Sequence, residues 1–87
     1  MPQISYFLGV IIRMFYRDHN PPHFHAVYGD YEALIDIQKN EIISGNLPPR
    51  VLGLVVEWTA LHQQELMDNW ERSKNREPLA KIGRAHV

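Results

Sequence analysis

The hydrophobic pattern of this 87-residue chain changes its period once, near residue 45, and that change constrains what the chain can fold into. Residues 9–44 alternate apolar and polar side chains between turn signals, which is typical of strands. Residues 50–73 repeat apolar side chains at helical spacing, with no proline and a single glycine. A sheet and a helix that each have one apolar side bury those sides against each other. The sequence therefore predicts an α+β domain, an antiparallel four-stranded meander with one long C-terminal amphipathic helix packed on one face.

Turn-forming residues divide the first half of the chain into strands. Gly29-Asp30 suits a two-residue hairpin loop, and Pro48-Pro49 suits the first turn of the helix. These signals place the strands at residues 9–17, 23–28, 31–38 and 41–44.

The hairpin loop also indicates which side chains share the core face. It predicts three opposing pairs, Tyr28–Tyr31, Ala26–Ala33 and Phe24–Ile35. The first strand extends this face through the pairs Tyr16–Phe24, Met14–Ala26 and Ile12–Tyr28, because a slip by one residue would bury arginines. The apolar stripe of the helix comprises Val51, Leu54, Val55, Trp58, Leu61 and Leu66, widened by Leu52 and Trp70. His62 lies within that stripe, so we expect its imidazole to face the core and to form one hydrogen bond there.

The opposite face of the predicted sheet collects polar and charged side chains. It comprises Arg13, Phe15, Arg17, His23, His25, Val27, Glu32, Leu34 and Asp36. His23 falls directly opposite Asp36. A sheet face without a covering helix is ordinarily polar, so this set is either a solvated face or a binding or catalytic surface.

Composition narrows the classes of protein that remain. The chain is 45% hydrophobic, carries 9 Lys and Arg against 10 Asp and Glu, and has no cysteine. These values fit a single globular domain and exclude disulfides and thiolate zinc sites. The sequence has no apolar run near the length of a membrane span and no secretion signal, so we expect a cytoplasmic protein without a membrane partner. The near-zero net charge disfavours a strongly electrostatic nucleic-acid binder.

The segment around Pro21 and Pro22 carries the residues best suited to metal binding or catalysis. His23 and His25 share one side of a strand, and His19 is a candidate third ligand for a divalent metal, with Asp18 as an alternative. Asp36 would then orient an imidazole. Such a site would support a metal-dependent hydrolase or nuclease.

The same residues allow two further interpretations. His23, His25 and Arg17 are the candidate catalytic residues of a metal-free RNA cleavage, in which a base, an acid and a cation suffice. Alternatively the face binds nucleic acid or a protein partner through Arg13, Phe15, Arg17, His23, His25 and Asp36. No cofactor is required in either case.

A third class of function is structural. Ile11, Phe15, Val27, Leu34 and Ile43 would form an apolar patch on this face, suited to a homodimer.

The last seven residues do not continue the sequence pattern of the chain before them. Back-translated as AAG ATC GGA AGA GCA CAC GTC, residues 81–87 read like an adapter used in short-read DNA sequencing. We therefore predict a single domain over residues 1–80 and a non-native tail over 81–87, and Arg84 and His86 enter no functional argument.

The run Asp18-His19-Asn20-Pro21-Pro22-His23-Phe24-His25-Ala26 resembles a small bacterial family, domain of unknown function 4160. Gly45-Asn46-Leu47-Pro48, Val56-Glu57-Trp58 with His62, and the segment from Glu65-Leu66 to Asn69-Trp70 resemble it too. The resemblance implies a compact α+β domain. It also implies a neighbouring gene for a second small protein, as in toxin–antitoxin modules, and hence a protein or RNA partner.

Overall fold

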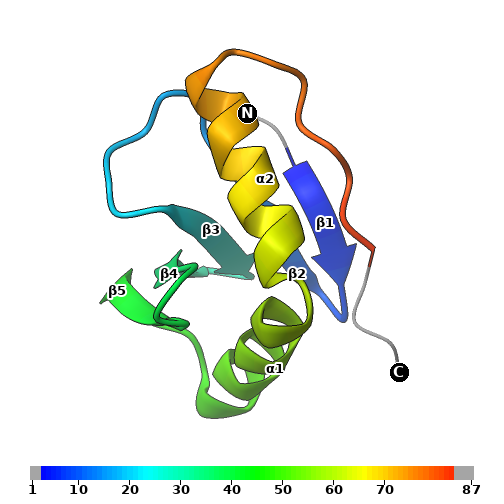
Figure 1. The fold of residues 1–87 in the computed structure, drawn as a ribbon. Coiled ribbons are helices and arrows are strands. Elements are labelled where there is room, and N and C mark those ends of the chain that lie inside the picture. Colours follow the sequence, from blue (N-terminus) through cyan, green and yellow to red (C-terminus); the bar gives the residue numbers. More distant parts are fainter. Residues whose placement is uncertain (1–2, 84–87) are drawn as a thin grey trace.

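The computed structural model describes residues 3–83 as one antiparallel sheet covered by two helices (Figure 1). The five strands follow one another across the sheet in chain order, so the sheet is a meander. Strands are β1 (Gln3–Phe7), β2 (Val10–Arg13), β3 (His23–Tyr28), β4 (Tyr31–Asp36) and β5 (Glu41–Gly45). Helices are α1 (Pro49–Leu61) and α2 (Gln63–Lys74). The α+β class and the meander are confirmed.

The sheet has five strands where the sequence predicted four, because β1 precedes the first predicted strand. A tight turn at Leu8-Gly9 joins β1 to β2, with φ of +49° and +83° at these two residues. Hairpin turns of this kind usually contain Asn or Asp before glycine. Leucine gives no such turn signal, which is why the strand was missed.

The single predicted helix is broken at His62, where φ is −126° and ψ is 22°. The His62 N–H donates to Thr59 O and the His62 carbonyl accepts from Leu66 N–H, so one helix ends and the next begins here. Neither proline nor glycine marks the break. A projection onto a straight helix therefore placed Leu61 in the core, whereas its side chain is 65% exposed.

His62 itself is half-buried at the junction of the two helices. Its Nδ1 lies 2.6 Å from Glu65 Oε1, and its ring lies 5.0 Å from the Trp58 ring. The single hydrogen bond agrees with the sequence prediction, while the partial exposure follows from the helix break.

The register of the central hairpin is confirmed and that of its neighbour is corrected. Tyr28 faces Tyr31, Ala26 faces Ala33 and Phe24 faces Ile35. On the other side Ile12 faces Ala26, two residues away from the predicted pairing with Tyr28. A shift of two residues keeps every side chain on its predicted face. Two tyrosines expected in the core, Tyr16 and Tyr31, lie at its edge and are exposed.

The core lies between the helices and one face of the sheet. Trp58 of α1 is fully buried and stacks on Phe7 at 5.0 Å, with Phe24 edge-on at 5.9 Å. Further buried side chains come from β1 to β4, from Met14 directly after β2, and from both helices: Ile4, Val10, Ile12, Met14, Ala26, Ala33, Ile35, Val55, Leu66 and Trp70. The helices cover one face and leave the other uncovered. Neither helix in residues 3–83 is long and apolar enough to cross a membrane.

Part of the segment predicted to be a non-native tail lies against β1. The Ile82 N–H donates to Ile4 O at 2.8 Å and its side chain is buried, while Trp58 Nε1–H donates to Gly83 O. Arg84 and His86 lie outside the described residues. The adapter origin of 81–87 stays a prediction.

Gly45 occupies a position that only glycine fits, and this yields a test of the fold. Its φ is +80°, and a Cβ there would lie 2.2 Å from Glu32 O. We expect Gly45→Ala to lower the free energy of unfolding by about 1–3 kcal/mol because of the backbone conformation, with the clash adding to this loss.

Gly53→Ala is the matched control, because a Cβ on this α1 residue meets nothing within 4 Å. That substitution should stabilise by about 0.5–1 kcal/mol in urea unfolding. Equal effects of the two would contradict the β4–β5 geometry.

Candidate metal centre

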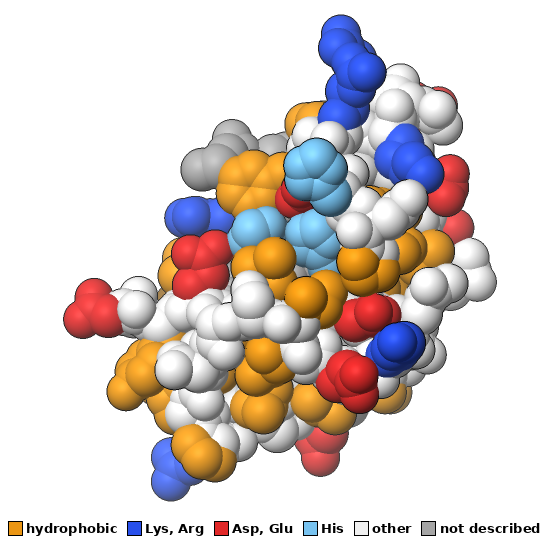
Figure 2. All heavy atoms as spheres, turned by 90° about the vertical axis from the view of Figure 1, so that its left-hand side faces the viewer, with side chains coloured by type: hydrophobic (Ala, Val, Ile, Leu, Met, Phe, Trp, Pro, Cys, Tyr) orange, Lys and Arg blue, Asp and Glu red, His pale blue; other side chains and the backbone are white. Residues whose placement is uncertain are grey.

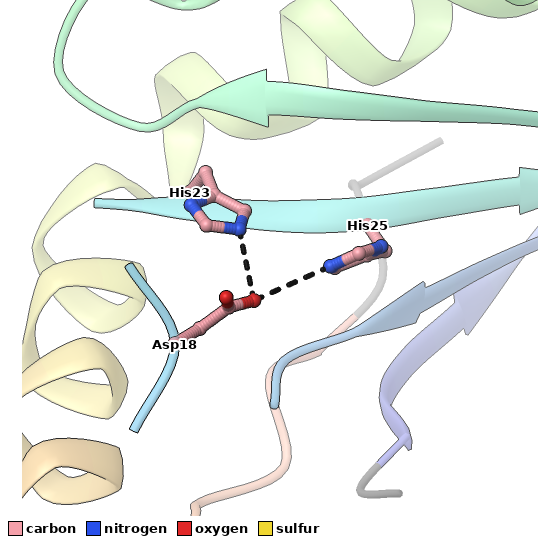
Figure 3. Close-up of side chains that lie close together, drawn as sticks. All are labelled: Asp18, His23 and His25. Atoms are coloured by element: carbon pink, nitrogen blue, oxygen red, sulfur yellow. Dashed lines mark hydrogen bonds and ion pairs between the residues drawn. The ribbon is translucent and has the colours of Figure 1, made fainter. Parts of the chain in front are cut away.

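Two histidines and one aspartate meet where β3 begins (Figure 3). His23 and His25 alternate along β3 and therefore project to the same side of the sheet. Asp18 comes from the loop between β2 and β3. One ligand atom from each of the three residues lies within 4.8 Å of the other two. We call these three residues the His–Asp cluster.

The loop turns Asp18 toward β3. Arg17, directly before it, has a φ of +57°, which reverses the chain locally. One Asp18 oxygen, Oδ1, accepts the His19 backbone N–H at 2.8 Å. Its other oxygen, Oδ2, is thereby left to face the two imidazoles.

His23 is held by acceptors on both ring nitrogens. Its Nδ1 lies 2.8 Å from the Pro21 carbonyl oxygen, which only accepts, so Nδ1 carries a hydrogen. Its Nε2 lies 3.0 Å from Asp18 Oδ2. The side chain is buried, 5% exposed, and its ring lies 5.3 Å from the Trp70 ring of α2. The sequence analysis placed His23 on an uncovered face. In the structure it lies at the beginning of β3 and is buried there, with the Trp70 ring of α2 beside it.

His25 repeats this arrangement one pleat further along β3. Its Nδ1 lies 2.8 Å from Glu32 Oε2, so Nδ1–H donates to that carboxylate. Its Nε2 lies 3.6 Å from the same Asp18 Oδ2, is buried and has no hydrogen-bond partner. Phe15 packs edge-on against the ring at 4.4 Å.

The His–Asp cluster therefore directs both Nε2 atoms at one carboxylate oxygen. With both Nδ1 atoms protonated, a neutral imidazole would direct its Nε2 lone pair at an ionised carboxylate oxygen, which is repulsive. Protons on Nε2 or one metal cation would remove this repulsion. Metal-ligating histidines typically donate their other ring N–H to a carbonyl or carboxylate, as both do here.

The separations between Asp18 and the two imidazoles suit ligands of one ion. Donor atoms about 2.1 Å from a metal lie about 3.0 Å apart at a right angle and about 3.4 Å apart at the tetrahedral angle. The two imidazole nitrogens lie 3.0 and 3.6 Å from Asp18 Oδ2. Two nitrogens and one carboxylate oxygen form a set that borderline metals favour.

The Asp18 carboxyl responds to its surroundings in opposite ways. Burial raises its pKa, but the His19 N–H hydrogen bond, the charge of His23 and the hydrogen bonds of His23 and His25 lower it by more. The pKa of Asp18 thus lies below its ordinary value of 3.8. The carboxylate is accordingly ionised at neutral pH and available as a ligand.

The other metal-ligand candidate, His19, is exposed and its side chain is not part of the cluster. Its contribution is the backbone N–H that holds Asp18. The structure thus brings together His23, His25 and the alternative third residue, Asp18.

Asp36 lies opposite His23 in the register, as expected, but does not orient it. Its Oδ1 accepts the backbone N–H groups of Gln38 and Lys39 at 2.9 and 2.8 Å. A short aspartate side chain commonly bonds the backbone that follows it. The turn after β4 therefore occupies the Asp36 oxygen. The acceptors that orient the His23 ring are instead the Pro21 carbonyl and the Asp18 carboxylate.

The two candidate cations, Arg17 and Arg13, come from the loop after β2 and from β2. Arg17 is exposed and lines a hollow of about 280 Å³ together with Asp18 and Lys74. Arg13 faces His25 across the β2–β3 pairing. Figure 2 shows histidine side chains gathered at the surface, with hydrophobic and acidic side chains beside them.

Sequence reasoning missed three groups at the site: the Glu32 carboxylate as a partner of His25, Trp70 as the cover of His23, and Lys74. Glu32 had a detectable signal, because it is the diagonal neighbour of His25 in the confirmed hairpin register. Trp70 and Lys74 had none, since only the packing of α2 brings them near.

A family model described as a domain of unknown function, DUF4160, matches residues 9–71. The match covers well over half of the chain and includes the whole His–Asp cluster, and the chain belongs to this family. No curated protein and no solved structure gives a significant match.

The low pKa of Asp18 predicts a pH-dependent contribution to stability. A carboxyl whose pKa is lower in the folded state stabilises the fold above its unfolded value, and this contribution is lost as pH falls through the folded pKa. We expect Asp18→Asn to lower the free energy of unfolding by about 1–3 kcal/mol at neutral pH, because charged hydrogen bonds are lost. In urea unfolding at pH near 3 or below, the difference from wild type should shrink.

The control for this test is Asp68→Asn, which removes a carboxylate from the exposed side of α2. Its effect should stay within about 0.5 kcal/mol at both pH values. A loss for Asp18→Asn that does not change with pH would contradict the ionised, hydrogen-bonded carboxylate.

Proposed function

We propose that this member of the DUF4160 family binds one divalent transition metal through Asp18, His23 and His25 and uses it in a hydrolytic reaction. One observation carries the proposal. Both Nδ1–H groups are committed to outer acceptors, at 2.8 Å each, which directs both Nε2 atoms to one carboxylate oxygen. This is the arrangement of metal-ligating histidines held by outer partners.

The ligand count favours a reactive centre over a structural one. Structural zinc sites are closed by four protein ligands, whereas catalytic sites use three and leave a position for water. Within residues 3–83, the His–Asp cluster is the group of three such ligands that lies close enough. A metal-bound water is a nucleophile near neutral pH. The hollow beside Asp18 gives a substrate access to that position.

The geometry weakens the metal-free acid–base reading of His23, His25 and Arg17. His23 is nearly inaccessible, and both of its nitrogens already face acceptors. A general acid or base must reach a substrate proton within hydrogen-bond distance. A buried ligand, in contrast, needs contact only with the ion.

Binding through the uncovered sheet face is a second candidate, favoured by the apolar side chains there. Tyr6 is 53% exposed and Ile43 is 44% exposed, with Ile11, Val27 and Leu34 half-buried beside them. Phe15 is half-buried against His25, and Glu32 adds negative charge, so this face suits a protein better than nucleic acid. The partner would be a second copy or the product of a neighbouring gene in a toxin–antitoxin-like or regulatory pair.

The metal proposal predicts about one bound ion per chain. Protein purified without chelator and titrated with Zn²⁺ or Mn²⁺ should bind one ion in isothermal titration calorimetry, confirmed by elemental analysis. His25→Ala and Asp18→Ala should each abolish tight binding. His25 is the better test residue than His23, because removing buried His23 also removes packing on Trp70. Affinity should increase from pH about 5.5 to about 7.5, since protons compete with the ion for imidazole nitrogens.

Two histidines outside the cluster serve as matched controls. His19→Ala and His62→Ala should keep the ion, because neither side chain belongs to the cluster. Glu32→Gln, which weakens the support of His25, should reduce affinity by about 10- to 100-fold without abolishing it. The proposal fails if wild-type protein binds neither ion, or if His19→Ala loses the ion while Asp18→Ala retains it.

The sheet-face candidate predicts self-association. We expect light scattering at micromolar concentration to give the mass of a dimer, and Ile43→Asp to shift it to a monomer, because a charge cannot be buried unpaired in an apolar interface. Lys39→Asp, on the turn after β4, is the control for a new exposed carboxylate. A strict monomer at these concentrations excludes the homodimer.

A further inference from the structure

We propose that the hollow lined by Arg17, Asp18 and Lys74 binds the phosphate group of the substrate, so that the substrate is a phosphate monoester. This inference rests on the proposed metal-dependent hydrolysis and names its substrate class. The hollow measures about 280 Å³, near the lower limit of ligand sites, so it fits a small head group rather than an entire large ligand.

The hollow adjoins the His–Asp cluster through a shared residue. Asp18 directs Oδ2 at the two imidazoles and also lines the hollow. A group bound in the hollow therefore lies beside the place where the three ligand atoms converge. Figure 1 shows the loop between β2 and β3 passing next to the end of α2, which brings Arg17 and Lys74 to the same hollow.

The two cations share the hollow with one carboxylate, that of Asp18, whose Oδ2 faces the two imidazoles. Within residues 3–83, neither Arg17 nor Lys74 lies in an ion pair with a carboxylate. They come from different elements, the loop and the last residue of α2, so no local helix pairing explains their proximity. Two unpaired cations that converge beside a candidate metal centre indicate an anionic ligand.

The kinds of cation favour phosphate among anions. A guanidinium presents a planar fork of donors to two phosphate oxygens, and a lysine ammonium adds a compact charge. Together with a divalent ion they would neutralise a dianion and the charge that develops during phosphoryl transfer. A carboxylate ligand carries a single charge and would leave one cation unmatched.

The size and surroundings of the hollow favour a monoester over a nucleic-acid backbone. The chain has a formal net charge of −1, and of the two aromatic side chains in the loop, Phe15 packs against His25, which leaves Tyr16 as the exposed one. A polyanion would be attracted weakly, whereas one terminal phosphate needs only this hollow.

The reaction balances with water as the only co-substrate. The oxygen of a water molecule attacks phosphorus and forms a P–O bond. The P–O bond to the alcohol breaks, and the leaving oxygen takes the proton that the water loses. The products are an alcohol and inorganic phosphate.

The test measures phosphate binding and metal binding on the same preparations. Inorganic phosphate is titrated into Zn²⁺-loaded and metal-free wild-type protein, and into the double variant Arg17→Gln/Lys74→Gln. We expect the double variant to bind phosphate at least about 10-fold more weakly, because two charged hydrogen-bonding partners are lost, while its zinc content stays unchanged. The control is Lys39→Gln/Arg50→Gln, which removes two exposed cations elsewhere and should leave both affinities within about twofold.

The outcomes separate this inference from the function on which it rests. Unchanged phosphate affinity in the double variant, with zinc retained, overturns the subsite and leaves the metal centre standing. Loss of phosphate affinity in a protein that holds no zinc supports the subsite and overturns the metal centre. Adenosine monophosphate should compete with phosphate, and a short RNA without terminal phosphates should not. Competition by that RNA would overturn the assignment to a monoester.

Discussion

Burial of Phe24 and Ala26 beneath the helices fixes strand β3, and both histidines of the candidate site take their positions from that strand. Side chains alternate along a strand, so the burial of these two residues directs His23 and His25 to the other side. The β3–β4 register then places Glu32 diagonally from His25, within hydrogen-bond distance. Trp58 is the main contact from α1, stacked on Phe7 and edge-on to Phe24. The hydrophobic core thus sets the spacing of the two imidazoles without any contribution from their own chemistry.

The His–Asp cluster, in contrast, leaves one of its buried ring nitrogens without a hydrogen-bond partner. The buried Nε2 of His25 has no hydrogen-bond partner, and buried polar atoms without partners cost free energy. The physical consequence is an affinity for positive charge at this point. Protons and metal ions supply that charge with different geometry: protons satisfy each nitrogen separately, whereas one ion joins all three ligands. Fixed Nδ1 hydrogen bonds keep the imidazoles from rotating away, which favours the single ion.

The site and the uncovered sheet face share strands but not chemistry. The cluster lies at the beginning of β3, where the loop and the end of α2 meet, and the exposed apolar side chains of Tyr6 and Ile43 lie on the outer strands. Arg17 and Lys74 stand on the side of the cluster that faces the hollow. Glu32, which holds His25, belongs to the sheet face as well, so a protein bound on that face would lie beside the metal centre.

The sequence by itself determined the α+β class, the central hairpin with its register, and the side of β3 on which both histidines lie. These features follow from local periodicity and turn chemistry, which act over a few residues. It also singled out the segment from Asp18 to His25, which contains the His–Asp cluster. Local patterns did not reveal β1, because Leu8-Gly9 lacks the usual turn residues, or the helix break at His62, where no proline or glycine stands.

Tertiary structure alone decided which residues complete the site. The Asp36 carboxylate accepts hydrogen bonds from the backbone after β4 and is therefore not available to the imidazoles. The turn at Arg17 brings Asp18 to the imidazoles instead of the His19 side chain. Trp70 and Lys74 arrive only because α2 begins anew after the break and ends beside the loop. Hydrogen-bond partners far apart in the chain are chosen by the packed geometry of whole elements, and no periodicity within one element encodes that choice.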